Sequence, residues 1–111
     1  MRYSRYFLLA ALGAAATSAF AQQGAADADA KQIRSRIAMC EGCHGIPGYR
    51  TAYPEVYHVP KLGGQTATYL VNALNAYKSG QRRHPSMRGI ALGLTDREIA
   101  GIAAWYAGEK K

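Results

Sequence analysis

The segment from Met39 to Arg50 reads MCEGCHGIPGYR and concentrates the side chains best suited to chemistry. Cys40 and Cys43 lie three positions apart, and His44 follows the second cysteine directly. These are the only two cysteines of the 111-residue chain. Thiolates are nucleophiles and metal ligands, and imidazoles are common metal ligands. The spacing of these three residues therefore decides which chemistry the segment can perform.

Four interpretations of this spacing compete. An export compartment would allow a disulfide, but one between positions this close encloses a very small loop and gains little entropy. A thioredoxin-like redox pair belongs beside a βαβ pattern, which this sequence lacks. For zinc, the adjacent Cys43 and His44 cannot easily both point at one tetrahedral centre, and no second ligand pair follows. The fourth interpretation is C-x-x-C-H, the attachment motif of c-type haem. Two thiols add to the haem vinyl groups and the imidazole lies under the iron, so this motif predicts one covalent haem c per chain.

A haem iron needs a second axial ligand or an open site. The candidates are Met87, His84, His58 and Met39. Met39 directly precedes the first cysteine and should point away. Met87 lies in HPSMRGIA, which we expect to be a loop that can reach the opposite haem face. Its polar, proline-containing flank argues against an ordinary core methionine. We therefore predict Met87 as the distal ligand, with His84 as the runner-up.

Three helices should position these residues. In the first, Ile33, Ile37 and Cys40 recur at helical spacing on one face, which brings the first cysteine to the core. The stretch from Gly45 to Gly64 holds three of the four prolines and should be irregular, as expected of a segment that wraps around something.

The second helix should begin after Thr66 and stop at Gly80. The third should begin with the capping box Thr95-Asp96-Arg97-Glu98 and end at Gly108. Its predicted buried residues are Ile99, Ile102, Ala103 and Tyr106. Almost no strand pattern is present, so the expected class is all-α with long loops.

The first 21 residues are typical of a cleaved secretory signal peptide. Arg2 and Arg5 precede a short apolar run, and Ala19-Phe20-Ala21 fits the cleavage pattern. We expect a flexible lead-in over 22–29, a single domain over 30–111, and a periplasmic protein without a stable membrane span after cleavage. Cleavage lowers the net charge from +7 to +5. The basic residues are scattered, which argues against nucleic acid and favours an acidic protein partner.

Four segments in order resemble the class I bacterial c-type cytochromes, in particular the small monohaem periplasmic kind. They are CEGCHG, PKLGGQ-x3-YLVNAL, M-x3-A and LTDREIAGIAAWYAG, and they span most of residues 30 to 108. The resemblance implies three to four helices around one covalent haem. It also implies that His44 is the proximal ligand, that Met87 is the distal ligand, and that the carbonyl of Pro60 accepts the imidazole N–H.

One departure concerns the crossing of the first and last helices, where such proteins often carry a glycine and an aromatic residue on the first helix. Here KQIRSRIAM has isoleucines and arginines instead. We expect Ile37 to pack against Trp105 or Tyr106, with Gly101 permitting the close approach. Tyr49, Tyr53 and Tyr57 recur at four-residue spacing and are expected either to pack along the haem rim or to hydrogen-bond a haem propionate.

Function follows from the ligand set. A histidine and a methionine close both axial positions, and methionine favours ferrous iron. This describes a periplasmic one-electron carrier and not an enzyme. Two alternatives stay open: a small haem subunit of a periplasmic dehydrogenase complex, and a haem enzyme or gas binder with a labile sixth ligand. Arg82, Arg83 and Arg88 flank the ligand segment and are expected to dock an acidic redox partner, such as an oxidase or dehydrogenase.

Overall fold

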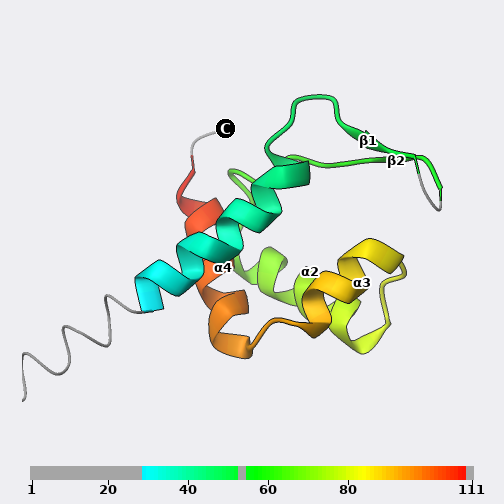
Figure 1. Cartoon of the computed structure of the whole chain (residues 1–111). Coiled ribbons are helices and arrows are strands. Elements are labelled where there is room, and N and C mark those ends of the chain that lie inside the picture. The colour runs from blue at the N-terminus through cyan, green and yellow to red at the C-terminus, as the bar shows by residue number, and fades with distance from the viewer. Residues whose placement is uncertain (1–28, 53–54, 110–111) are drawn as a thin grey trace, which may run out of the picture. The chain divides into compact units, whose positions relative to one another are not determined.

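The structure, a computed structural model, describes residues 29–52 and 55–109 (Figure 1). The predicted signal peptide over 1–21, and the lead-in up to residue 28, lie outside the described residues. The first of two units ends at Gln32, and the packing described below is within the second, Ile33–Lys111. The elements are a helix over 29–44, β1 (Arg50–Thr51), β2 (Tyr57–His58), α2 (Ala67–Ser79), α3 (Pro85–Leu92) and α4 (Asp96–Gly108).

The limits of α2 and α4 follow from their capping residues. The hydroxyl of Thr66 accepts the N–H of Tyr69 at 3.2 Å, and α2 stops at Gly80, whose φ of 83° suits a residue without a side chain. Before α4, the hydroxyl of Thr95 accepts the N–H of Glu98, and the Glu98 carboxylate accepts the N–H of Thr95 at 2.8 Å. Both helices begin and end where the sequence predicts.

The expected loop over 81–94 is wrong, because it contains the two-turn helix α3. His84 stands in the N-cap position and Pro85 occupies the first turn, where its fixed φ suits a helix start and its missing N–H costs nothing. The apolar positions in this stretch are too few to show a clear period. Met87 consequently lies in the first turn of a helix and not in a loop.

The segment from Gly45 to Gly64 is mostly irregular, as expected, but it also contains a short antiparallel hairpin. Arg50 pairs with His58 and Thr51 pairs with Tyr57. The hydroxyl of Thr51 accepts the N–H of Tyr57 at 3.1 Å, which reinforces the pairing. The hairpin extends beyond the C-terminal end of the first helix (Figure 1).

The core lies where the helix over 29–44, α2 and α4 meet. The buried members of this cluster are Ile37, Leu70, Leu94, Ile99, Ile102, Ala103 and Tyr106, with Ile33 and Cys40 packed against them. All four residues predicted for the buried face of the last helix are buried. The predicted apolar face of the first helix is confirmed, and it brings Cys40 to the core.

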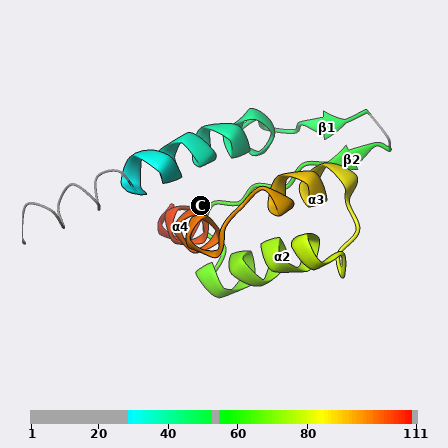
Figure 2. The same cartoon turned by 60° about the horizontal axis from the view of Figure 1, so that its bottom comes forward.

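The first helix crosses α4 at a glycine (Figure 2). A Cβ placed on Gly101 would lie 2.5 Å from Cδ1 of Ile33, so the two backbones approach closely only because Gly101 has no side chain. Gly101 permits the close approach, as predicted, but the side chain that lies over it is Ile33. Ile37 belongs to the same buried cluster as Tyr106, one of its two predicted partners, whereas Trp105, the other, is 44% exposed.

An ion pair reinforces the same crossing. Nε of Arg36 lies 2.7 Å from Oε1 of Glu98, and the Glu98 side chain is 3% exposed. The Glu98 carboxylate also accepts from the backbone and hydroxyl of Thr95, so its burial is compensated by several hydrogen bonds. The first helix is thereby attached to the start of α4 by both apolar and ionic contacts.

Candidate functional site

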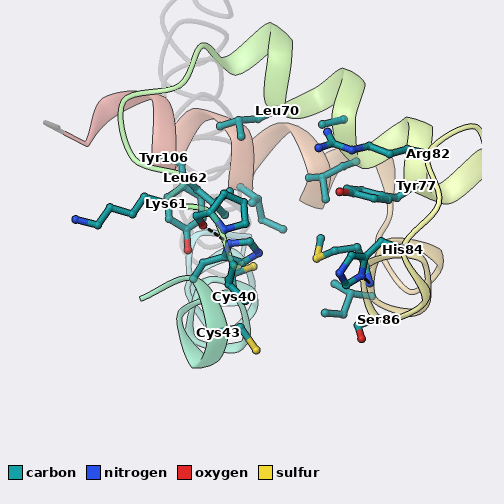
Figure 3. A pocket seen from close by; sticks show the side chains of 18 of the residues that line it. Cys40, Cys43, Lys61, Leu62, Leu70, Tyr77, Arg82, His84, Ser86 and Tyr106 are labelled. Atoms are coloured by element: carbon teal, nitrogen blue, oxygen red, sulfur yellow. Dashed lines mark hydrogen bonds between the residues drawn. The ribbon is translucent and has the colours of Figure 1, made fainter. Parts of the chain in front are cut away.

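A cavity of about 430 Å³ opens between the first helix, the segment around Pro60, and the helices α2 and α3. Five sequence-predicted residues line it: Cys40, Cys43, His44, Pro60 and Met87. Figure 3 shows Cys40 and Cys43 on one side of the hollow, and Tyr77, Arg82 and His84 on the other. The structure therefore brings together residues that are up to 47 positions apart in the sequence.

The walls of the cavity are largely apolar. Leu70 and Leu74 contribute from α2, Ile90 from α3, and Leu94 and Ile102 from around α4. A volume of this size is in the range of cofactor sites. Apolar walls with two thiols and an imidazole at one side match the chemistry of a covalently attached haem, which is a large, flat and mostly apolar group. The residues present thus fit haem c.

The imidazole of His44 is oriented by a backbone acceptor. Its Nδ1 lies 2.6 Å from the carbonyl oxygen of Pro60, so the ring donates this N–H and keeps the lone pair of Nε2 free. Metal-binding histidines almost always donate their second ring N–H in this way. The hydrogen bond joins the end of the first helix to the segment that follows the hairpin.

The two thiols differ in their surroundings. Cys40 is half-buried, Cys43 is exposed, and neither forms a disulfide. Burial, followed by the negative charge of Glu41, raises the pKa of the Cys40 thiol. Among the described residues, no three His, Cys, Asp or Glu side chains gather as a metal site.

The four candidates for the distal ligand differ in their exposure and in their hydrogen bonds. Met87 is half-buried and lines the cavity from the first turn of α3. His84 also lines it, but its Nδ1 accepts the backbone N–H of Met87 at 3.3 Å. His58 also borders the cavity but is exposed on β2. Met39, expected to point away, borders the cavity while remaining 41% exposed.

Sequence reasoning missed a group of aromatic and cationic side chains around His84. The ring of Tyr57 lies 4.5 Å from that of His84, and the ring of Tyr77 lies 6.4 Å from it. The guanidinium of Arg82 stacks 4.8 Å from the Tyr77 ring centroid and donates to the hydroxyl of Tyr69 at 3.4 Å. The tyrosine spacing of the loop gave a partial indication: Tyr57 borders the cavity, whereas Tyr49 is exposed and does not line it. Tyr53 lies outside the described residues.

Tyr106 was predicted only as a core residue, but it also contacts the cysteine motif. Its hydroxyl donates to the carboxylate of Glu41, between the two cysteines, at 2.5 Å, and its carbonyl accepts the N–H of Gly64 at 3.0 Å. Burial, with the hydrogen bond to Glu41, raises the pKa of Tyr106. One residue of α4 thus connects the cysteine segment, through its side chain, with the segment that follows Pro60, through its backbone.

Comparison with known proteins agrees with this site. No family model matches the sequence. The chain is 40% identical to cytochrome c-554(548) of Halomonas halodenitrificans over 85 residues, which are 74% of this chain and 98% of that protein. It is 35% identical to cytochrome c4 of Pseudomonas aeruginosa over 82 residues, or 74% of this chain and 39% of that protein.

Comparison of the fold with solved structures also finds a c-type cytochrome. The crystal structure of reduced recombinant cytochrome c4 from Pseudomonas stutzeri matches with a TM-score of 0.50 and 31% identity, covering 64% of this chain and 38% of that one. The chain therefore spans about two fifths of the cytochrome c4 proteins but nearly the whole of cytochrome c-554(548). The two cysteines, the oriented histidine, the apolar cavity and these likenesses agree, and the chain belongs to the small bacterial c-type cytochromes, which bind haem c and carry electrons.

Proposed function

We propose that this cytochrome is a soluble one-electron carrier whose haem is attached through Cys40 and Cys43 and ligated by His44 and Met87. The observation that carries the proposal is that His44 and Met87, from separate helices, line one apolar cavity. When bound, the haem supplies a reversible ferrous–ferric couple. The residues around it hold the group, orient its ligands and exclude water.

The surroundings of the two ligands suit electron transfer better than catalysis. Pro60 fixes the orientation of the His44 ring, so the ligand needs little movement when the charge of the site changes. The apolar walls from α2 and α4 disfavour the additional charge of the ferric state. With both axial positions filled, no position is free for a substrate, which favours a carrier over a haem enzyme or gas binder.

Optical spectroscopy of the exported, haem-matured protein tests the ligand set. We expect sharp reduced c-type bands, a weak near-red methionine–iron band in the oxidised protein, and no change with carbon monoxide. Met87→Ala should lose the near-red band and bind carbon monoxide while keeping its covalent haem. Ready binding of carbon monoxide by the unmodified protein would instead indicate an open iron and a haem enzyme or sensor.

Export to the periplasm is part of the proposal. The basic start, the short apolar run and Ala19-Phe20-Ala21 support a signal peptide over 1–21. Among the residues with described structure, no helix has the length and apolar character needed to cross a bilayer. The mass of the exported protein should correspond to a chain starting at Gln22 plus one haem, and a mass that includes residues 1–21 would contradict cleavage.

An acidic redox partner is proposed to dock beside the cavity. Arg82 and Arg83 line the cavity and are exposed, and Arg88 is exposed on α3. Contacts with Tyr69 and Tyr77 hold Arg82 in place, which reduces the entropy lost when it pairs with an incoming carboxylate. These three charges raise the positive potential on the Met87 side of the molecule.

Electron transfer with small charged probes tests this docking surface without the natural partner. Replacing Arg82, Arg83 and Arg88 by glutamine should slow oxidation by the hexacyanoferrate anion by about tenfold at low salt. Oxidation by a cationic cobalt complex should not slow. A matched variant with Lys31, Arg34 and Arg97 changed to glutamine loses the same charge outside the cavity lining. Equal slowing of the two variants would show that only net charge matters.

A further inference from the structure

The first turn of α3 has an unusual capping residue. Ser, Thr, Asp and Asn are the preferred N-cap residues, yet His84 occupies this position. Its Nδ1 accepts the backbone N–H of Met87 at 3.3 Å, and its backbone carbonyl accepts the N–H of Arg88 at 2.8 Å. For Nδ1 to accept, the ring must carry its proton on Nε2. The residue capped by His84 is thus the predicted distal ligand itself.

Apart from the cap and Pro85, α3 itself offers little to stabilise its first turn. It has eight residues, no acidic side chain in the first turn, and a glycine, Gly89, in its interior. Helices this short are marginal without tertiary contacts, and an interior glycine weakens them further. The position of the Met87 backbone therefore depends strongly on its cap.

The His84 ring is itself fixed by two other elements. It packs against Tyr57 of β2, with ring centroids 4.5 Å apart, and makes an edge contact with Tyr77 of α2 at 6.4 Å. Figure 3 shows His84 beside Tyr77 at the edge of the cavity. A serine or aspartate could supply the acceptor but could not reach these rings. Through His84, the hairpin and α2 both determine where the first turn of α3 lies.

We propose that His84 is a positioning residue for the distal ligand: its ring, held by Tyr57 and Tyr77, caps α3 through the Met87 N–H and keeps the Met87 side chain directed into the cavity. This inference rests on the proposed ligation by Met87. His84 acts through the backbone of Met87 and is not itself a ligand. The runner-up of the sequence prediction thus receives a different role.

Exogenous imidazole provides the test, because it binds ferric haem in competition with Met87. Its apparent affinity rises as the population with Met87 bound falls. Three variants separate the contribution of the hydrogen-bond acceptor from that of the aromatic ring. His84→Ala removes both, His84→Phe keeps only the ring, and His84→Asn keeps only an acceptor. We expect imidazole to bind about fivefold more tightly to the Ala and Phe variants, the factor expected for a lost cap, and about two- to threefold more tightly to the Asn variant, which keeps an acceptor but loses the contacts with the two tyrosine rings.

Thr95→Ala is the matched control, because it removes the equivalent cap from α4, which carries no ligand. It should lower stability but leave imidazole affinity within about twofold. Unchanged affinity in His84→Ala and His84→Phe, an Asn variant that behaves like Ala, or an equal rise in Thr95→Ala would each overturn the positioning role. A near-red band that is absent from wild type, or that persists in Met87→Ala, would instead overturn ligation by Met87, and with it this role.

Discussion

The two sides of the cavity are built in different ways. On the His44 side, the two cysteines and the histidine lie within five consecutive residues at the end of a long helix, and a 2.6 Å hydrogen bond to Pro60 orients the ring. On the Met87 side, a two-turn helix carries the proposed ligand, and its cap makes a longer hydrogen bond of 3.3 Å.

The difference shows where each side obtains its rigidity. The first helix is attached to α4 by the Ile33–Gly101 approach and by the Arg36–Glu98 ion pair. Helix α3 packs against α2 through Ala91 and Ile90, and the rings of Tyr57, Tyr77 and His84 support its first turn. We therefore expect His44 to lose its position only when the whole protein unfolds. We expect Met87 to lose its position first, under smaller perturbations.

The largest effect should come from the cysteines. Replacing Cys40 and Cys43 together by serine removes both thioether bonds, so no haem should stay with the chain after denaturation. Haem staining on a denaturing gel measures this directly. Met39→Leu, which borders the same cavity without a thiol, is the control and should retain full staining, as should Met87→Ala. Retained haem in the double serine variant would refute covalent attachment.

The next effect concerns the support of the His44 side. Gly101→Ala places a methyl group where Ile33 Cδ1 lies 2.5 Å away. Overpacking typically costs about 1–3 kcal/mol, and the better helix propensity of alanine offsets up to about 1 kcal/mol of this. We expect the free energy of unfolding to fall by about 1–2 kcal/mol in denaturant titrations. An unchanged value would mean that the two helices separate easily, contrary to the comparison above.

A smaller change in stability, of opposite sign, is expected for a substitution in α3, the helix that contains Met87. A Cβ at Gly89 would meet no atom within 4 Å, so Gly89→Ala should stabilise α3 by about 0.5–1 kcal/mol. The stiffer helix should hold Met87 more firmly and weaken exogenous imidazole binding by about two- to fivefold. Stronger imidazole binding in this variant would show that flexibility of α3 does not limit ligation.

The smallest effect is the contribution of Tyr106 to the loss of stability at alkaline pH. Burial and the hydrogen bond to Glu41 raise the pKa of Tyr106 above its ordinary value of about 10. The folded state then holds this proton more tightly than the unfolded state, so the stabilisation is complete below about pH 10 and is lost as pH rises further. Tyr106→Phe should make the alkaline decline of stability shallower, by at most about 1.4 kcal/mol per pH unit.

Denaturant unfolding of the ferrous protein between about pH 8 and pH 11 gives this slope. At about pH 8, below the range in which tyrosine titrates, loss of the hydroxyl should lower stability by about 0.5–1.5 kcal/mol, and this difference serves as the reference from which the two curves converge as pH rises. Parallel curves for Tyr106→Phe and wild type would mean that Tyr106 does not contribute to the alkaline decline.

Much of the fold could be predicted because its determinants are local. Thr66 and Gly80 limit α2, and the Thr95–Glu98 capping box starts α4, through hydrogen bonds made within four residues. The apolar period of Ile33, Ile37 and Cys40 determines which face of the first helix is buried. Helix α3 was missed because its eight residues show no clear apolar period and its cap is a histidine, so Pro85 was the one local signal of a helix start.

The sequence by itself determined the haem attachment motif, because the spacing of Cys40, Cys43 and His44 is fixed by covalent connection along five residues. Only the tertiary structure decided that Ile33 faces Gly101, that Tyr106 contacts Glu41, and that His84 lies between Met87 and two tyrosine rings. These contacts join segments far apart in the chain, and their geometry depends on how the helices pack and not on any local pattern.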